Sequence, residues 1–302
     1  MMRGGLRAAR DLARDAASAW IDDYAPSMGA ALAFYTLFSI APLLLIVISV
    51  AGLAFGEQAA RGEIMAQLSG LLGVDSARAV ESMLEGLNRP SAGILGTTVG
   101  LAALLIGATT VFGELQDAMD RIWRAPSRTT GSGLWALVRA RLLSLSMVLG
   151  IGFLLMVSLI FSAALAALGK WWGPWFGEWE LIANGVDIGV SLLLVTVMFA
   201  AIYKWMPRVK VAWPDVWVGA AITAVLFTVG KALIGLYIGR SGIASAFGAA
   251  ASLVVLLLWV YYSAQVFLLG VEITWVYAHR HGSMRERVPA AAGLAPQRGL
   301  TP

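Results

Sequence analysis

The sequence predicts an all-α protein that crosses a membrane several times, and three observations lead to this prediction. Hydrophobic residues make up 59% of the 302 residues, and only 13% are charged, about half the charged share of a soluble domain. The mean hydropathy is +0.77. Six apolar stretches reach the length of about 20 residues that a helix needs to cross a bilayer. We therefore predict a polytopic membrane protein with six transmembrane helices.

The six predicted spans follow one another along most of the chain. Their approximate bounds are residues 29–55, 92–112, 142–168, 181–203, 216–238 and 246–277. The second span is the weakest, because it is rich in glycine and threonine. The first is too long for the apolar region of a cleavable signal peptide, and a polar segment precedes it.

Lysine and arginine residues predict the orientation of these spans. With the N-terminus inside, 16 of the 22 basic residues fall on one side, five fall on the other, and Lys231 lies within a span. Because basic residues collect on the cytoplasmic side of membrane proteins, both termini are expected in the cytoplasm. The same sorting accounts for the net charge of +4, so no nucleic-acid partner is expected.

The two ends of the chain are expected to lie outside the transmembrane domain, which covers 27–279. In the leader, 1–26, four arginines follow a helical spacing and form one stripe. This pattern predicts an amphipathic helix on the inner leaflet, and a solvated helical leader is the alternative. The tail, 280–302, is rich in small residues, proline and glycine, and is expected to be disordered.

The largest predicted outer loop lies between the first two spans. Apolar residues recur in it at helical spacing on both sides of Gly73, and Pro90 follows the second run. We predict an amphipathic helical hairpin over about 57–90 on the outer face, which either caps a cavity or packs on the bundle.

Tryptophan residues gather at the predicted membrane boundaries. Four of them lie in the outer connection, at positions 171, 172, 175 and 179. Trp205, Trp213 and Trp217 lie at the inner boundary. Both groups are typical of interfacial belts. A stacking platform for a ligand is the alternative interpretation of the outer group.

Several segments together resemble the YihY/BrkB family of bacterial inner-membrane proteins, over about residues 20–279. The segments that carry the resemblance include ALAFYTLFSIAPLLLIVISVAGLAFG from Ala31, ELQDAMDRIWRAP from Glu114 and GKALIGLYIGRSGIASAFGAAASLVVLLLWVYYSAQVFLLGVEITWVY from Gly230. The resemblance implies a multi-pass protein of the bacterial cytoplasmic (inner) membrane. One name of the family refers to virulence and serum resistance, and the activity proposed for its members is export or permeation of small molecules.

An older label for that family is ribonuclease BN, and the residues argue against this activity. The chain has no cysteine and two histidines, His279 and His281, both near its end. No cluster of histidine and aspartate appears that could hold two catalytic metals. We therefore expect no enzyme activity, no metal and no cofactor.

Ionisable residues inside the predicted spans are the first candidates for a functional site, because burying charge in a bilayer is costly. Asp187 and Lys231 both lie about 10 Å below the outer boundary, at a rise of about 1.5 Å per residue. They are expected to form an ion pair or to line an outward cavity. The alternatives are a purely structural pair, or a lysine that snorkels outward.

Three further residues complete the list of transport or gating candidates. Glu272 lies near the inner end of its span, at a depth similar to that of Arg141, with Glu114 and Arg139 near the same level. These charges predict either an inner gate or a static cluster that fixes helix packing. Pro42, in the first span, frees a backbone carbonyl and predicts a discontinuous helix that exposes it, or a merely structural kink.

Two GxxxG patterns predict sites of close helix contact, within the chain or between protomers. They are Gly96 with Gly100, and Gly235 with Gly239. Six spans are few for a transporter, which is compatible with a homo-oligomer, although no residue specifies the contact.

The function that these observations predict is secondary transport, as an exporter of an unidentified small molecule. A bundle with buried charge and a proline in its first span supports it, and no nucleotide-binding motif is present. The alternative is an envelope scaffold or interaction protein that does not transport. The expected partners are membrane lipids and the transported molecule.

Overall fold

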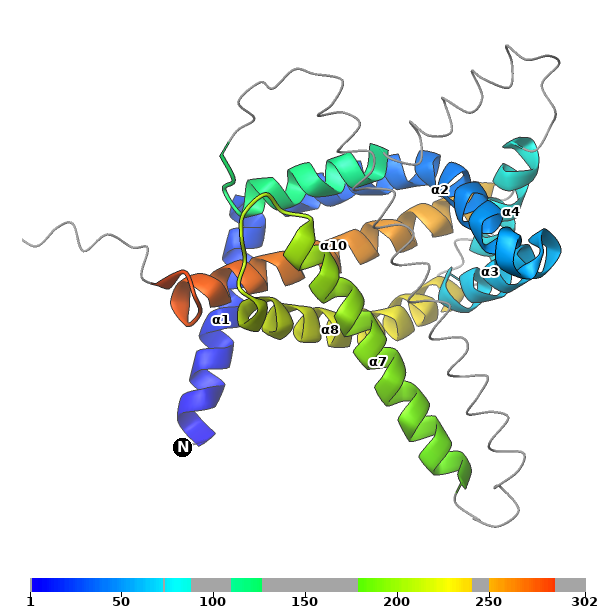
Figure 1. Cartoon of the computed structure of the whole chain (residues 1–302). Helices are drawn as coiled ribbons and strands as arrows, with labels where there is room; N and C mark the ends of the chain where they lie inside the picture. The colour runs from blue at the N-terminus through cyan, green and yellow to red at the C-terminus, as the bar shows by residue number, and fades with distance from the viewer. Residues whose placement is uncertain (1, 73, 88–109, 127–178, 241–249, 286–302) are drawn as a thin grey trace, which may run out of the picture.

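The computed structural model describes residues 2–72, 74–87, 110–126, 179–240 and 250–285 (Figure 1). These residues are helices and the connections between them, and no strand occurs among them. The labelled helices are α1 (Met2–Asp22), α2 (Ala25–Phe55), α3 (Glu57–Leu72), α4 (Val74–Leu87), α7 (Trp179–Trp205), α8 (Trp213–Arg240) and α10 (Ala251–Arg280). A further helical segment covers 110–122.

Four helices of the described part are long and apolar enough to cross a membrane: α2, α7, α8 and α10. They coincide with the first, fourth, fifth and sixth predicted spans, and each extends past the predicted bounds at one end or both. The third predicted span and nearly all of the second lie outside the described residues. The prediction of an all-α membrane protein is therefore confirmed.

Helix α10 is the centre of the arrangement. It packs along both α2 and α8, and α8 also packs against α7. Figure 1 shows α2, α8 and α10 running between α1 at one end and the pair α3 and α4 at the other. We call these the α1 end and the α3–α4 end of the bundle.

A buried tyrosine joins α7, α8 and α10. The Tyr203 hydroxyl donates a hydrogen bond to the backbone oxygen of Phe267 (3.0 Å) and shares a second with the Thr223 hydroxyl (3.0 Å). Gly270 faces both hydroxyls, and a Cβ added there would lie 1.9 Å from Thr223 Oγ1. The three helices can therefore approach this closely only while residue 270 has no side chain.

Helix α1 packs across the α1 end of α10. Leu12 and Ala16 contact Ile273 and Val276, and Asp15 forms an ion pair with Arg280. The predicted amphipathic helix in the leader therefore exists, and part of its apolar face lies against protein. Its position on a membrane leaflet stays a prediction.

Helix α2 runs without a break through Pro42. Of the two alternatives for this proline, the discontinuous helix does not form, because the turns on both sides of Pro42 continue the helix. A role for Pro42 in transport stays a prediction. Pro26 lies in the first turn, where its missing N–H leaves no helical bond unmade. Gly56 ends the helix with a φ of 85°, which glycine adopts without strain.

Helices α3 and α4 follow α2 directly. Arg61 of α3 lies 3.8 Å from the Glu81 carboxylate and 3.9 Å from that of Glu85, both on α4. Val80 and Leu84 are buried against Leu256 of α10. The pair therefore packs on the bundle through both helices, α3 against α2 and α4 against α2 and α10. Its position on the outer side of the membrane stays a prediction.

Tryptophans mark the connection between α7 and α8. Trp205, Trp213 and Trp217 are 68%, 42% and 40% exposed, and their rings contact one another in sequence. The Lys204 ammonium lies 5.4 Å from the centre of the Trp213 ring. Exposed aromatic rings beside a lysine are what an interfacial belt requires.

Candidate functional site

The most unusual polar group of the described part is the carboxylate of Glu272. It lies on α10 near the α1 end and is completely buried (0% exposed). No donor among the described residues satisfies either of its oxygens, and the carboxyl of Asp23 lies within hydrogen-bond reach. Asp22 and Asp23, at the junction of α1 and α2, and Arg124 are the charged groups close enough to act on it electrostatically.

The backbone around this carboxylate is also unusual. Tyr24 and Arg124 have φ angles of 58° and 49°, and they are the two non-glycine residues of the described part with positive φ. Side chains make this conformation costly, so packing must hold it in place. Tyr24 follows Asp23 directly, and Arg124 places its guanidinium 4.9 Å above the Trp275 ring. Both strained residues therefore adjoin the surroundings of Glu272.

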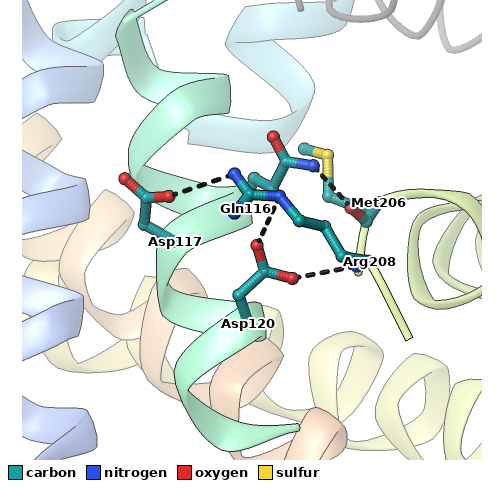
Figure 2. Close-up of polar contacts among 5 residues, drawn as sticks. All are labelled: Gln116, Asp117, Asp120, Met206 and Arg208. Atoms are coloured by element: carbon teal, nitrogen blue, oxygen red, sulfur yellow. Dashed lines mark hydrogen bonds and ion pairs between the residues drawn. The ribbon is translucent and has the colours of Figure 1, made fainter. Parts of the chain in front are cut away.

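A second cluster of polar groups, which we call the Asp120 clamp, joins segment 110–122 to the connection after α7 (Figure 2). The Asp120 carboxylate accepts a hydrogen bond from the Arg208 backbone N–H (2.9 Å) and lies 3.2 Å from its Nε. Gln116 donates to the Met206 backbone oxygen (3.0 Å). Asp117 contributes a longer contact to Arg208, at 3.9 Å.

The Asp120 clamp yields a prediction with its own control. Asp120→Ala is expected to lower the free energy of unfolding by about 1–2 kcal/mol, since it removes two charge-assisted contacts of a half-exposed arginine. Asp117→Ala, at an exposed position in the same cluster, is expected to cost at most about 0.5 kcal/mol. Thermal unfolding in detergent micelles measures both, and equal losses would show that the clamp does not depend on Asp120.

Glu114 lies one turn before this cluster. Burial, and next the negative charge of Asp117, raise the pKa of the Glu114 carboxyl above its usual range. Glu114 is not among the charged groups that act on Glu272. These two acids, which the sequence placed at one inner level, therefore belong to two separate clusters. Arg139 and Arg141 lie outside the described residues.

A cavity of about 350 Å³ opens between α8 and α10, on the α3–α4 side of Glu272. Its lining is apolar and aromatic, with one amide: Leu233, Ile234, Tyr237, Leu258, Tyr261, Tyr262 and Gln265. The Gln265 amide nitrogen donates to the backbone oxygen of Pro26 (3.3 Å), while its Oε1 is buried with no partner among the described residues. An apolar space with few polar groups is typical of a small-molecule site.

The other sequence candidates are not gathered around this cavity. Lys231 is exposed on α8, directly after Gly230, against which the Tyr262 hydroxyl packs. Asp187 belongs to α7, and its side chain lies outside the described part, so its pairing with Lys231 stays a prediction. Pro42 is buried inside α2.

Sequence reasoning missed three residues of this region: Asp23, Arg124 and Gln265. The sequence could have identified Gln265 as a candidate, because it is an uncharged polar residue in the middle of an apolar span. Asp23 and Arg124 lie outside the predicted spans, where charges are common. Only their packing against α10 marks them.

The profile of the virulence factor BrkB family matches residues 16–294. A UPF0761 membrane protein of Pseudomonas aeruginosa (strain LESB58) is 26% identical over 87% of this chain and 62% of its own length. One from Ralstonia nicotianae is 28% identical over 83% of this chain and 55% of its own. One from Alkalilimnicola ehrlichii is 29% identical over 90% and 59%.

The chain thus spans about three fifths of the length of these relatives, and the name of each states a membrane location without an activity. No solved structure matches it significantly. The match to the family profile extends over most of the described helices and over the polar groups around Glu272. The chain belongs to the virulence factor BrkB family of membrane proteins.

Proposed function

We propose that this protein is a secondary transporter that exports a small molecule, and not an enzyme. The observation that carries the proposal is a line of polar groups on α10. Gln265 lines the cavity and Glu272 lies seven residues further, two helical turns or about 10 Å closer to the α1 end. Each has a buried oxygen that no donor among the described residues satisfies. Buried polar groups that are not satisfied within the protein are typical of a transport pathway.

The proposal includes the finer topology. It has six spans in the bacterial inner membrane, with both termini in the cytoplasm. The distribution of lysine and arginine supports this orientation. The α1 end is then cytoplasmic, the α3–α4 end is periplasmic, and the cavity lies between them.

Metabolite profiling of cells and spent medium tests the export. A deletion strain, the wild type and an overexpressing strain are compared at matched growth. We expect one compound to accumulate inside the deletion strain and outside the overexpressing strain. If no compound follows gene dosage across several growth conditions, the exporter proposal is wrong, and an envelope scaffold becomes the better explanation.

Three variants at matched protein level connect such a compound to the site. Gln265→Leu fills the polar position of the cavity and is expected to reduce export at least tenfold. Lys231→Ala tests the intramembrane charge next to Gly230. Val225→Ala, at an exposed position of α8 outside the cavity lining, is the control and is expected to export normally. Normal export by Gln265→Leu would contradict a pathway through this cavity.

A further inference from the structure

We propose that Glu272 binds a proton, which it shares with Asp23, and that this carboxyl pair is the coupling site of the transporter. The coupling role of this pair rests on the proposed export function. Proton binding by the pair does not depend on that function. The site lies at the α1 end, about 10 Å along α10 from the cavity amide of Gln265.

Burial is the first argument for the proton. A fully buried carboxylate needs donors or a cation beside it, because leaving water without compensation costs several kcal/mol. Among the described residues, no N–H or hydroxyl donor satisfies either oxygen of Glu272, and the carboxyl of Asp23, which is within hydrogen-bond reach, can donate to it only when one of the two carries a proton. The Arg124 guanidinium acts on it from a distance, while it stacks on the Trp275 ring. A proton removes the charge and so makes the burial tolerable.

The surrounding charges are the second argument. Asp22 and Asp23 bring two negative charges toward Glu272 and Arg124 brings one positive charge. With all three acids ionised, the group is negative and repulsive. One proton on Glu272 or Asp23 replaces the repulsion between these two carboxyls with an attraction.

Accessibility completes the site. Asp23 is half-buried, whereas Glu272 is fully buried. A proton from water can therefore reach the carboxylate of Asp23 and pass to that of Glu272, which restores the charge of Asp23. Metal binding is the weaker alternative, because the described residues hold no group of three or more acidic or histidine side chains placed to bind a metal ion.

Infrared titration of the full-length protein in lipid vesicles tests the proton directly and needs no substrate. We expect the C=O stretching band of a protonated carboxyl near neutral pH in the wild type. Glu272→Gln is expected to abolish this band. Glu57→Gln, at an exposed acid of α3, is the control and is expected to keep it. A wild type without the band, or one whose band survives Glu272→Gln, would overturn the proposal.

A second variant covers the case in which Glu272→Gln does not fold. Asp23→Asn leaves Glu272 in place and removes one neighbouring negative charge. The midpoint at which the band disappears is expected to move to lower pH by about one unit or more. An unchanged midpoint would show that the two carboxyls do not share the proton.

The two proposals fail in different ways. If no compound follows gene dosage and the band is present, the exporter is wrong and the proton site stands. If a compound is exported and the band is absent, export stands without this proton site. If both are present, export by Glu272→Gln should lose its dependence on the pH gradient, and an unchanged dependence would show that this site does not couple.

Discussion

Replacing Gly270 with alanine is expected to destabilise the bundle by about 3 kcal/mol or more, through overpacking and lost hydrogen bonds. The added Cβ would lie 1.9 Å from Thr223 Oγ1 and 2.3 Å from the Tyr203 hydroxyl. Neither atom can give way freely, because both groups are buried and already share a hydrogen bond. The helices α7, α8 and α10 must therefore separate, or the bonds must break.

Thermal unfolding of purified variants measures this effect. Gly235→Ala is the matched control, because no atom of the described residues lies within 4 Å of a Cβ added at that glycine. Its stability is expected to stay within about 0.5 kcal/mol of the wild type. Adding Thr223→Ala to Gly270→Ala should recover part of the loss. Equal stability of the two glycine variants would refute the close contact of the three helices.

Asp215→Ala is expected to cost about 2–3 kcal/mol and to release the end of α10. The Asp215 carboxylate, 2% exposed in the first turn of α8, accepts hydrogen bonds from the Ser283 backbone N–H (3.1 Å) and hydroxyl (2.7 Å). It also benefits from the positive end of the helix dipole. Without it, the turn after α10 loses its attachment to α8.

Limited trypsin digestion measures that release. Cleavage after Arg285 is expected to become at least tenfold faster in Asp215→Ala. Ser283→Ala is the graded control, because it removes the hydroxyl and leaves the backbone bond, at a cost of about 1 kcal/mol. If Asp215→Ala is cut no faster than the wild type, the attachment does not hold the turn.

The composition of the chain and its apolar runs were sufficient to predict the class of fold. Runs of apolar residues long enough to cross a bilayer must be helical there, because each backbone polar group needs a partner within the segment. Four of the six predicted spans, α2, α7, α8 and α10, consequently fall where hydropathy places them. The resemblance over nearly the whole chain likewise came from the sequence, and the family match bears it out.

Which residues meet was decided by the tertiary structure. The four long helices are apolar around nearly their whole circumference, so no amphipathic stripe tells which face turns inward. The GxxxG pattern at Gly235 finds no neighbour within the described chain, while Gly270, which no pattern marked, lies where α7, α8 and α10 approach one another closely. The position of Glu272 along its span placed it near one end of the helix. That position does not tell how the helix is rotated about its axis, and so does not tell which neighbours the side chain faces.

The surroundings of Glu272 illustrate the same limit. Its neighbours come from the junction of α1 and α2 and from the turn after segment 110–122. These are distant in sequence and lie outside every predicted span. The sequence alone therefore determined that a carboxyl group is embedded near one end of an apolar helix. Packing alone decided that this group is buried without a donor and faces Asp23, because both depend on how the helices rotate and meet.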